Sequence, residues 1–180
     1  MIYSRRLRLR GAERADIPRF VSWLNDPEVY RHLLLAYPLS QAAEEKWFDA
    51  MVARGPAEQI LVIEARIDNT WTAIGNTSFM DLDWVNRNAE IGIFIGEKSQ
   101  WNQGYGREAM KLMLRHGFNN MNLHRISLRV HADNPGGIKA YLAAGFVHEG
   151  VLRQDVYRNG EYLDVLVMAV LKSDWQDSDF

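Results

Sequence analysis

The segment WNQGYGREA, residues 101–109, combines residue types and spacing that suit anion binding. Hydrophobic patterning places it in a loop between a predicted strand and a predicted helix. Glycine lets the backbone approach a ligand closely, and the unpaired N–H groups of a helix's first turn, with the positive end of the helix dipole, suit a pyrophosphate. Gly104 and Gly106 therefore predict a phosphate-binding loop, although a glycine pair before a helix is also typical of a simple tight turn.

The same string satisfies the dinucleotide fingerprint G-x-G-x-x-A, with Asp133 loosely placed as a ribose-binding acid. We reject this alternative, because the fingerprint sets its first glycine at the end of a strand, whereas residues 96–103 intervene here after Ile95. The elements predicted upstream do not alternate between helices and parallel strands. A single β-α-β unit is too little sheet for a dinucleotide fold.

Asn134, Tyr141 and Glu90 are the other residues whose types could serve binding or catalysis. Asn134 precedes a proline, where asparagine is a common turn residue, and tyrosine on a short helix is commonly part of the core. Glu90 lies on a predicted strand, where it is equally well explained as an ordinary polar residue. Each of the three therefore keeps a structural interpretation beside a functional one.

Composition limits the classes of protein that need to be considered. A chain of 180 residues predicts one domain over residues 1–180, and a net charge of -2 lacks the basic excess that nucleic acid requires. The absence of Cys excludes disulfides, a thiolate nucleophile and Cys-ligated zinc. No apolar run suits a signal peptide or a membrane span, so a cytoplasmic protein without membrane contact is predicted.

The histidines and most aromatic residues indicate no separate site. No histidine pair has metal-ligand spacing with a carboxylate beside it, so no required metal is predicted. The histidines are His32, His116, His124, His131 and His148. One group of aromatic residues could line an acceptor pocket, but its members are more typical of a core. These are Trp23, Tyr30, Trp47, Trp71, Phe79 and Trp84.

Hydrophobic periodicity predicts two opening helices and then an antiparallel meander. The first helix covers residues 17–24 with Asp16 as N-cap, and the second begins after Ser40 and ends at Gly55. In the second helix, one face is expected to hold Ala43, Trp47 and Met51. The strands follow at residues 60–66, 72–80 and 89–95. In the last strand Ile91, Ile93 and Ile95 share one face, and Glu90, Gly92 and Phe94 share the other.

The second half predicts a β-α-β unit, a short helix and a closing hairpin. A helix over residues 106–119 leads to a strand over 124–131, and a helix over 136–143 ends at Gly145 before a strand over 146–151. Asn159-Gly160 joins residues 155–158 to a strand over 161–170. The predicted fold is an α+β domain around a mixed sheet. Because both faces of the last strand are apolar, it is expected to lie beside a partner subunit in a homodimer.

Four segments resemble the GCN5-related N-acetyltransferases (the GNAT family), in the branch of the RimJ/RimL ribosomal-protein and spermidine acetyltransferases. They agree in order and spacing: AEIGIFIG (89–96), WNQGYGREA (101–109), RVHADNPGGIKAYLAAGF (129–146) and EGVLRQDVYRNGEYLDVLVMAVL (149–171). The resemblance implies a mixed, mostly antiparallel, twisted sheet flanked by helices, with splayed central strands.

The family's pyrophosphate loop, (Q/R)-x-x-G-x-(G/A), matches at Gly104 and Gly106, while Trp101 stands where Gln or Arg is expected. The resemblance implies that acetyl-CoA binds backbone N–H groups of this loop and that its pantetheine pairs with the strand before it. The cofactor-binding residues implied are Phe94, Ile95, Asn102, Gln103, Gly104, Tyr105, Gly106, Arg107 and Asn134.

The resemblance assigns Tyr141 as the acid that protonates the departing thiolate. A base is also useful, because an amine attacks a thioester only as the free base and an alkylammonium pKa is about 10. Glu90, partly desolvated and with a raised pKa, could take that proton directly or through water. A backbone N–H near Ile95 could stabilise the oxyanion.

The predicted activity is direct transfer of an acetyl group from acetyl-CoA to a primary amine, because no residue pattern supports a covalent enzyme intermediate. The acceptor stays open between a protein or peptide N-terminus, a polyamine, an amino sugar and another small amine. A catalytically idle acyl-CoA-binding regulatory domain is the alternative outside enzymes. An acidic groove would favour polyamines, and the acidic residues in question are Asp26, Glu28, Asp81, Asp83 and Glu90.

Overall fold

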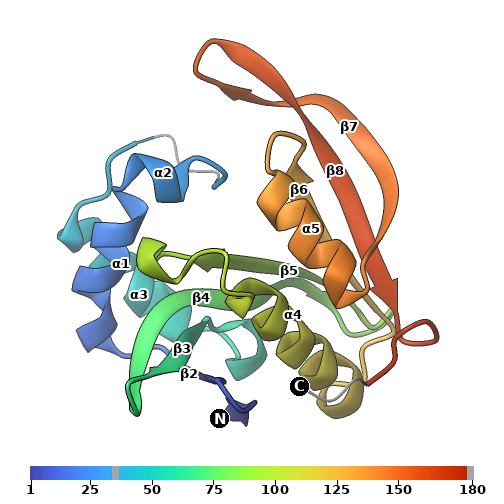
Figure 1. Cartoon of the computed structure of the whole chain (residues 1–180), viewed down its shortest axis with the longest axis horizontal. Helices are drawn as coiled ribbons and strands as arrows, with labels where there is room; N and C mark the ends of the chain where they lie inside the picture. Colours follow the sequence, from blue (N-terminus) through green and yellow to red (C-terminus); the bar gives the residue numbers. More distant parts are fainter. Residues whose placement is uncertain (34–36, 178–180) are drawn as a thin grey trace. The chain divides into compact units, whose positions relative to one another are not determined.

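The computed structural model describes residues 1–33 and 37–177 and has the expected mixture of helices and strands (Figure 1). The strands are β1 (Ile2–Tyr3), β2 (Leu7–Gly11), β3 (Leu61–Ile67), β4 (Thr70–Asp83), β5 (Asn88–Ile95), β6 (Arg125–His131), β7 (Val147–Arg158) and β8 (Glu161–Leu171). The α-helices are α1 (Ile17–Leu24), α2 (Pro27–Tyr30), α3 (Gln41–Val52), α4 (Tyr105–Arg115) and α5 (Pro135–Ala144). Short 3₁₀ or π turns are η1 (Arg14–Asp16), η2 (Pro56–Glu58), η3 (Lys98–Gln100) and η4 (His116–Asn120).

The strands form one mostly antiparallel sheet in the order β1-β2-β3-β4-β5-β6-β8-β7. Residue contacts divide the chain into two compact units. Unit 1 comprises Met1–Phe79 and Gly92–Tyr105, and unit 2 comprises Met80–Ile91 and Gly106–Phe180. The division passes through β4, β5 and the start of α4.

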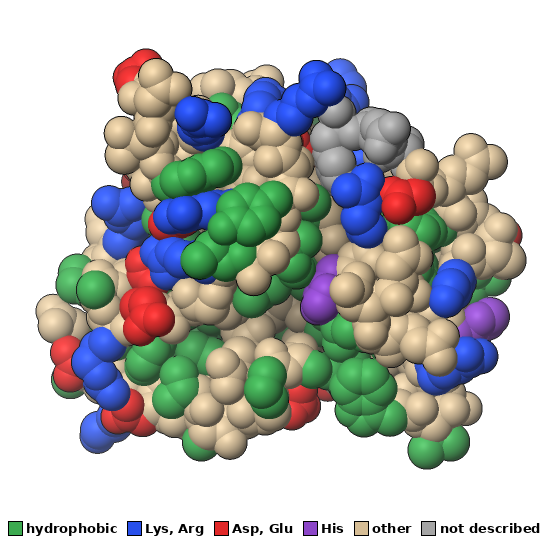
Figure 2. Space-filling model, turned by 90° about the horizontal axis from the view of Figure 1, so that it is seen from below, with side chains coloured by type: hydrophobic (Ala, Val, Ile, Leu, Met, Phe, Trp, Pro, Cys, Tyr) green, Lys and Arg blue, Asp and Glu red, His purple; other side chains and the backbone are tan. Residues whose placement is uncertain are grey.

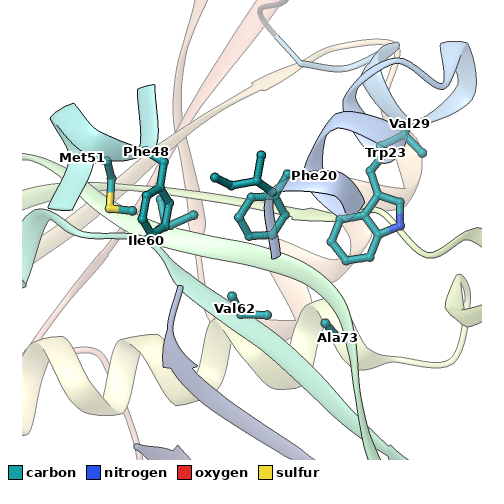
Figure 3. Packing of buried hydrophobic residues seen from close by; sticks show 9 residues of the cluster. Phe20, Trp23, Val29, Phe48, Met51, Ile60, Val62 and Ala73 are labelled. Atoms are coloured by element: carbon teal, nitrogen blue, oxygen red, sulfur yellow. The ribbon is translucent and has the colours of Figure 1, made fainter. Parts of the chain in front are cut away.

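The core of unit 1 lies between its helices and the strands β3 and β4 (Figure 3). Phe20 and Trp23 from α1 and Phe48 from α3 point toward Val62 and Ala73 on the strands. The expected helix over residues 17–24 is confirmed as α1. Its amphipathic spacing is what buries one face on the sheet.

The strands β1 and β2 were not predicted, although β2 carries a period-two signal. Leu7 and Leu9 are fully buried and alternate with Arg8 and Arg10. The two arginines conceal this pattern, because arginine is rarely buried without a partner and a segment rich in it is expected to be exposed. Here both pair with Glu64 of β3, a carboxylate that is 6% exposed.

Asp16 is the N-cap residue of α1, as predicted, but its side chain makes no capping bond to the helix, because its carboxylate accepts hydrogen bonds from Arg10 and from the backbone N–H of Glu13. The buried face predicted for the second helix is wrong. The helix α3 does begin after the Ser40 cap, whose hydroxyl accepts from the N–H of Ala43 at 3.1 Å. Its buried face, however, holds Glu44, Phe48 and Met51, while Trp47 is 37% exposed. The burial follows the i, i+4, i+7 spacing of a helix face rather than the expected row.

Unit 2 contains the closing hairpin and, of the predicted β-α-β unit, the first half of β5, nearly all of α4 and β6. β5 pairs with β6 in parallel, and β7 and β8 form the long orange-to-red hairpin of Figure 1. The hairpin turn has Asn159 at φ 51° and Gly160 at φ 87°, the backbone that the Asn-Gly pair predicts. Gly145, at φ 106°, ends α5 as expected.

The position of the last strand corrects the argument for a partner subunit. β8 pairs with β6 along one edge and with β7 along the other, so strands of its own chain cover both edges. β8 is therefore an interior strand, second from one end of the sheet, and no strand of a partner subunit is needed to cover it. The strand at that end of the sheet is β7, which exposes Val147, Val151, Leu152 and Tyr157.

Surface charge and helix length agree with the sequence. On the face shown in Figure 2, basic and acidic side chains are interspersed with apolar ones, as a net charge of -2 implies. Along residues 1–33 and 37–177, no helix combines the length and the apolar character that crossing a bilayer requires.

Candidate active site

The end of β5 presents backbone groups along an edge without a partner strand. β5 pairs with β6 only from Asn88 to Glu90, so the strand continues to Ile95 beyond this pairing. Phe94 directs its carbonyl oxygen toward β4, because a Cβ on Gly75 would lie 2.1 Å from that oxygen. Gly96 also faces β4, through its N–H bond to the Ile74 carbonyl at 2.8 Å. Backbone groups of successive strand residues point to opposite edges, so those of Ile95 point away from β4.

Phe94, a predicted cofactor-binding residue, is half-buried and packs against the core of unit 1. Its ring meets that of Trp23 edge to face with centroids 6.2 Å apart. Its carbonyl faces β4, and its side chain packs against the apolar cluster of Figure 3. The structure therefore gives Phe94 a packing role, whereas Ile95 keeps its backbone on the open edge.

Side-chain donors hold the loop after β5 in place. The indole Nε1 of Trp101 donates to the Ile95 carbonyl at 2.8 Å, and Gln103 Nε2 donates to the Ser99 carbonyl at 2.9 Å. Arg6 lies over the ring of Tyr105, with its guanidinium carbon 4.8 Å from the ring centroid. The two hydrogen bonds satisfy the carbonyl oxygens of Ile95 and Ser99, so these oxygens do not repel an anion that binds the N–H groups of the loop.

The backbone of the loop has the shape of an anion-binding nest. Asn102 and Gly104 both have left-handed conformations, with φ of 60° and 84°, two positions apart. Successive N–H groups in such an alternation point into one concavity. The helix α4 then begins at Tyr105, and its first-turn N–H groups have no partner within the helix. Residues 102–107 can therefore bind a pyrophosphate through N–H groups and the helix dipole.

The side chains of this segment divide between surface and core. Asn102, Gln103 and Arg107 are exposed, whereas Tyr105 is 7% exposed and anchors the start of α4. A Cβ on Gly106 would meet nothing within 4 Å, so open space lies beside the first turn of the helix. The predicted binding residues Asn102 to Tyr105 thus lie together in unit 1, and Gly106 and Arg107 continue them into unit 2.

Asn134 and Tyr141 lie on one side of α5, in unit 2. Asn134 is the N-cap, and its Oδ1 accepts the N–H of Gly137 at 2.9 Å. The side-chain oxygen of Asn134 therefore has the structural role of capping the helix, while the amide nitrogen of the same side chain can still donate to a ligand. Residues seven apart are about two turns apart on the same face of a helix, roughly 10 Å along its axis. Tyr141 contacts Phe146 with ring centroids 6.1 Å apart.

Glu90, the predicted base, is ion-paired in unit 2. Its Oε1 accepts from Nε of Arg129 at 3.1 Å, and its side chain is 20% exposed. Arg129 on β6 thus places a cation beside the carboxylate that is predicted to act as the base. The role of Glu90 as a base stays a prediction.

Comparisons with known proteins decide the family. Residues 6–147 match the family model described as the acetyltransferase (GNAT) domain. The spermidine N(1)-acetyltransferase of Vibrio cholerae is 31% identical over 167 residues, which cover 93% of this chain and 94% of that protein. The chain belongs to the GNAT acetyltransferases. It is therefore an acyl-CoA-dependent N-acyltransferase that acetylates an amine, with acetyl-CoA as the acyl donor.

Two further comparisons agree with this assignment. The uncharacterized N-acetyltransferase p20 of Bacillus licheniformis is 29% identical over 178 residues, 97% of each chain. The crystal structure of the Vibrio cholerae spermidine N-acetyltransferase in complex with CoA and spermine has a TM-score of 0.84 and 28% identity. That match covers 93% of this chain and 96% of the other. The mixed, mostly antiparallel sheet predicted for this acetyltransferase is confirmed.

Burial changes the chemistry available to Tyr141 in this acetyltransferase. Desolvation raises the pKa of Tyr141 to about 12, above the ordinary value of 10.0. The phenol therefore stays protonated at every pH at which amines become free bases, which an acid requires. The shift also moves it further from the pKa of a thiol, so proton transfer is less closely matched than an unperturbed tyrosine would make it.

Sequence reasoning missed an ion pair that links α2 to the start of the cofactor loop. Lys98 Nζ lies 2.7 Å from Asp26 and 2.6 Å from Glu28. The hydrogen bonds that Lys98 donates to Asp26 and, second in size, to Glu28 raise the pKa of Lys98, and the bond from Lys98 contributes most to lowering the pKa of Asp26. About 70 positions separate the partners, so sequence proximity holds no signal of this contact.

A hollow of about 300 Å³ lies elsewhere in unit 1, between η1, α1 and the strands β2 to β4. Its lining includes Arg10, Asp16 and Glu64, which already bind one another. None of its lining residues belongs to the predicted site. The hollow is therefore explained by the ion-pair network that joins β2 to η1.

Proposed function

We propose that this acetyltransferase transfers the acetyl group directly from acetyl-CoA to the amine, without an acyl-enzyme. The loop from Asn102 to Arg107 binds the pyrophosphate through N–H groups, and the open edge of β5 at Ile95 receives the pantetheine and the thioester. The observation that carries this assignment is the alternation of left-handed Asn102 and Gly104 directly before α4. The chain contains no Cys that could carry an acyl group.

In this proposal Tyr141 protonates the departing thiolate and the Ile95 N–H stabilises the oxyanion. The high pKa of Tyr141 keeps the donor protonated, and the backbone orientation of Ile95 makes its N–H accessible on the open edge. Asn134 contributes its amide N–H groups to the cofactor. Glu90, paired with Arg129, accepts the amine proton through water.

The first candidate acceptor is an amine with a single positive charge, such as a small monoamine or a peptide N-terminus. It is favoured because most acidic residues expected to form a groove have partners in their own chain. Asp26 and Glu28 share Lys98, and Glu90 binds Arg129. Carboxylates neutralised in this way attract a polycation less strongly.

A polyamine is the second candidate acceptor. The similarity to the Vibrio cholerae spermidine acetyltransferase, whose crystal structure contains CoA and spermine, favours it. A CoA-release screen with spermidine, a small monoamine, an amino sugar and N-terminal peptides separates the candidates. If none of these amines causes release of CoA, the proposed transfer reaction is overturned, and a catalytically idle acyl-CoA-binding domain is favoured.

Replacing Lys98 by alanine is expected to lower the KM for spermidine about three- to fivefold, because it releases two carboxylates beside the loop. Exposed ion pairs are worth roughly 1 kcal/mol or less, which sets this magnitude. The KM for a small monoamine should change by less than twofold. Steady-state kinetics at low salt checks both values, and an equal change for both amines would exclude a charge effect on the acceptor.

We also propose a homodimer, now on the basis of β7 rather than β8. β7 lies at the end of the sheet and exposes Val147, Val151 and Tyr157 at 56%, 45% and 63%. Apolar side chains on an unpaired edge strand favour association. Light scattering at micromolar concentration should give twice the chain mass of 20.8 kDa. A mass of one chain would contradict the dimer.

The domain boundary and the cellular location complete the proposal. A single acetyltransferase domain over residues 1–180 is supported by the family match, since residues 6–147 include parts of both units. A cytoplasmic location remains a prediction, and cell fractionation tests it.

A further inference from the structure

We propose that Trp101 is a positioning residue for acetyl-CoA, acting through the hydrogen bond from its indole to the carbonyl of Ile95. This inference rests on the proposed function of the loop and goes beyond it, because it assigns a task to a residue at which the chain departs from the motif. Trp101 stands where the family pattern has Gln or Arg.

The hydrogen bond from Trp101 determines which backbone group of Ile95, the N–H or the carbonyl, is available to a ligand at the open edge of β5. The backbone groups of Ile95 point away from β4, and pairing with β6 ends at Glu90. Nε1 of Trp101 lies 2.8 Å from the Ile95 carbonyl and satisfies it. A ligand at this place therefore meets the N–H of Ile95 as a donor without a competing carbonyl beside it. An oxyanion and the carbonyls of pantetheine require such a donor.

The same side chain anchors the loop to a rigid part of unit 1. The indole of Trp101 packs against the apolar cluster formed by α1, α3 and the strands. The nest that begins at Asn102 follows directly in the chain, so the position of its N–H groups depends on where Trp101 is held. Packing fixes the ring, and the bond to Ile95 fixes its rotation and the distance between loop and strand.

Two matched pairs of variants separate the hydrogen bond from the packing. Trp101→Phe keeps an aromatic ring and removes the N–H. Trp101→Gln and Trp101→Met have similar length, and only Gln carries an N–H donor. The parent should bind acetyl-CoA about five- to tenfold more tightly than Trp101→Phe, and Trp101→Gln more tightly than Trp101→Met. The KM for the amine should stay within threefold.

Calorimetric Kd for acetyl-CoA, steady-state kinetics and thermal unfolding of each variant give the required readouts. Trp84→Phe, at a tryptophan that is 56% exposed, is the control and should bind normally. A purely structural Trp101 would lower the melting temperature without changing Kd, and that result would overturn the proposal. Equal Kd within each pair would overturn it too. If a loop substitution at Gly104 weakens binding while the Trp101 pairs do not differ, the cofactor loop stands and this inference alone fails.

Discussion

Replacing Tyr141 by phenylalanine should lower kcat about 100-fold and leave the affinity for acetyl-CoA almost unchanged. The substitution keeps the ring that contacts Phe146 and removes only the hydroxyl, so packing in α5 persists. A general acid contributes roughly 10²- to 10⁴-fold to a rate, which sets the magnitude. Loss of kcat at constant affinity is the signature of an interaction made in the transition state.

The measurement is kcat with a saturating acceptor and saturating acetyl-CoA, together with the calorimetric Kd for acetyl-CoA. Tyr37→Phe is the matched control, because Tyr37 is 86% exposed and belongs to no part of the site. A loss of less than about threefold would remove the catalytic role from Tyr141. Water, or Glu90 with Arg129, would then become the candidates for proton transfer.

The pH profile provides a second test of the same residue. Because burial raises the pKa of Tyr141 to about 12, the hydroxyl keeps its proton throughout the range in which the acceptor amine titrates. The rate should rise with pH as the amine becomes a free base, and it should still be rising at about pH 10 because the alkylammonium pKa is about 10. A decline between pH 8 and 10, present in the parent and absent in Tyr141→Phe, would contradict the shifted pKa.

Replacing Gly104 by valine should weaken acetyl-CoA binding more than tenfold. Gly104 has φ 84°, a conformation that a β-branched residue adopts only with strain, and it lies between the N–H groups of the nest. A valine therefore distorts the loop and also places methyl groups where the backbone must approach a pyrophosphate. Calorimetry with acetyl-CoA measures the effect.

The control for Gly104 must impose the same backbone strain elsewhere. Gly160 in the β7–β8 turn has φ 87°, and a Cβ there would meet nothing within 4 Å. Gly160→Val should have a lower free energy of unfolding than the parent, while its affinity for acetyl-CoA stays within twofold. Unchanged affinity in a folded Gly104→Val protein would remove the pyrophosphate from this loop, and an equal loss in Gly160→Val would show a general effect of destabilisation.

Much of the fold could be predicted because the responsible interactions are local. The Ser40 cap, the Asn159-Gly160 turn and the stop at Gly145 each depend on residues within a few positions. Alternation along β5 and β6 and the helix period of α1 follow from burial of one face. β2 had the same alternation in Leu7 and Leu9, but charges concealed it until Glu64 was placed beside the arginines.

The features of the candidate site that could be predicted are likewise the local ones. The sequence by itself determined which family motif is present, where the glycine loop precedes a helix, and that Asn134 and Tyr141 share a helix face. These are relations within single segments of the chain. The nest at Asn102 and Gly104 is the backbone form that this loop takes in the structure.

Only the tertiary structure decided which partners these residues have. These contacts join residues far apart in sequence: Arg129 beside Glu90, Lys98 between Asp26 and Glu28, and the pairing of β8 between β6 and β7. The orientation of Ile95, with its carbonyl bound by Trp101, depends on which edge of β5 meets β4. Charge pairing and strand order are properties of residues brought together in space, and local patterns of hydrophobicity therefore cannot specify them.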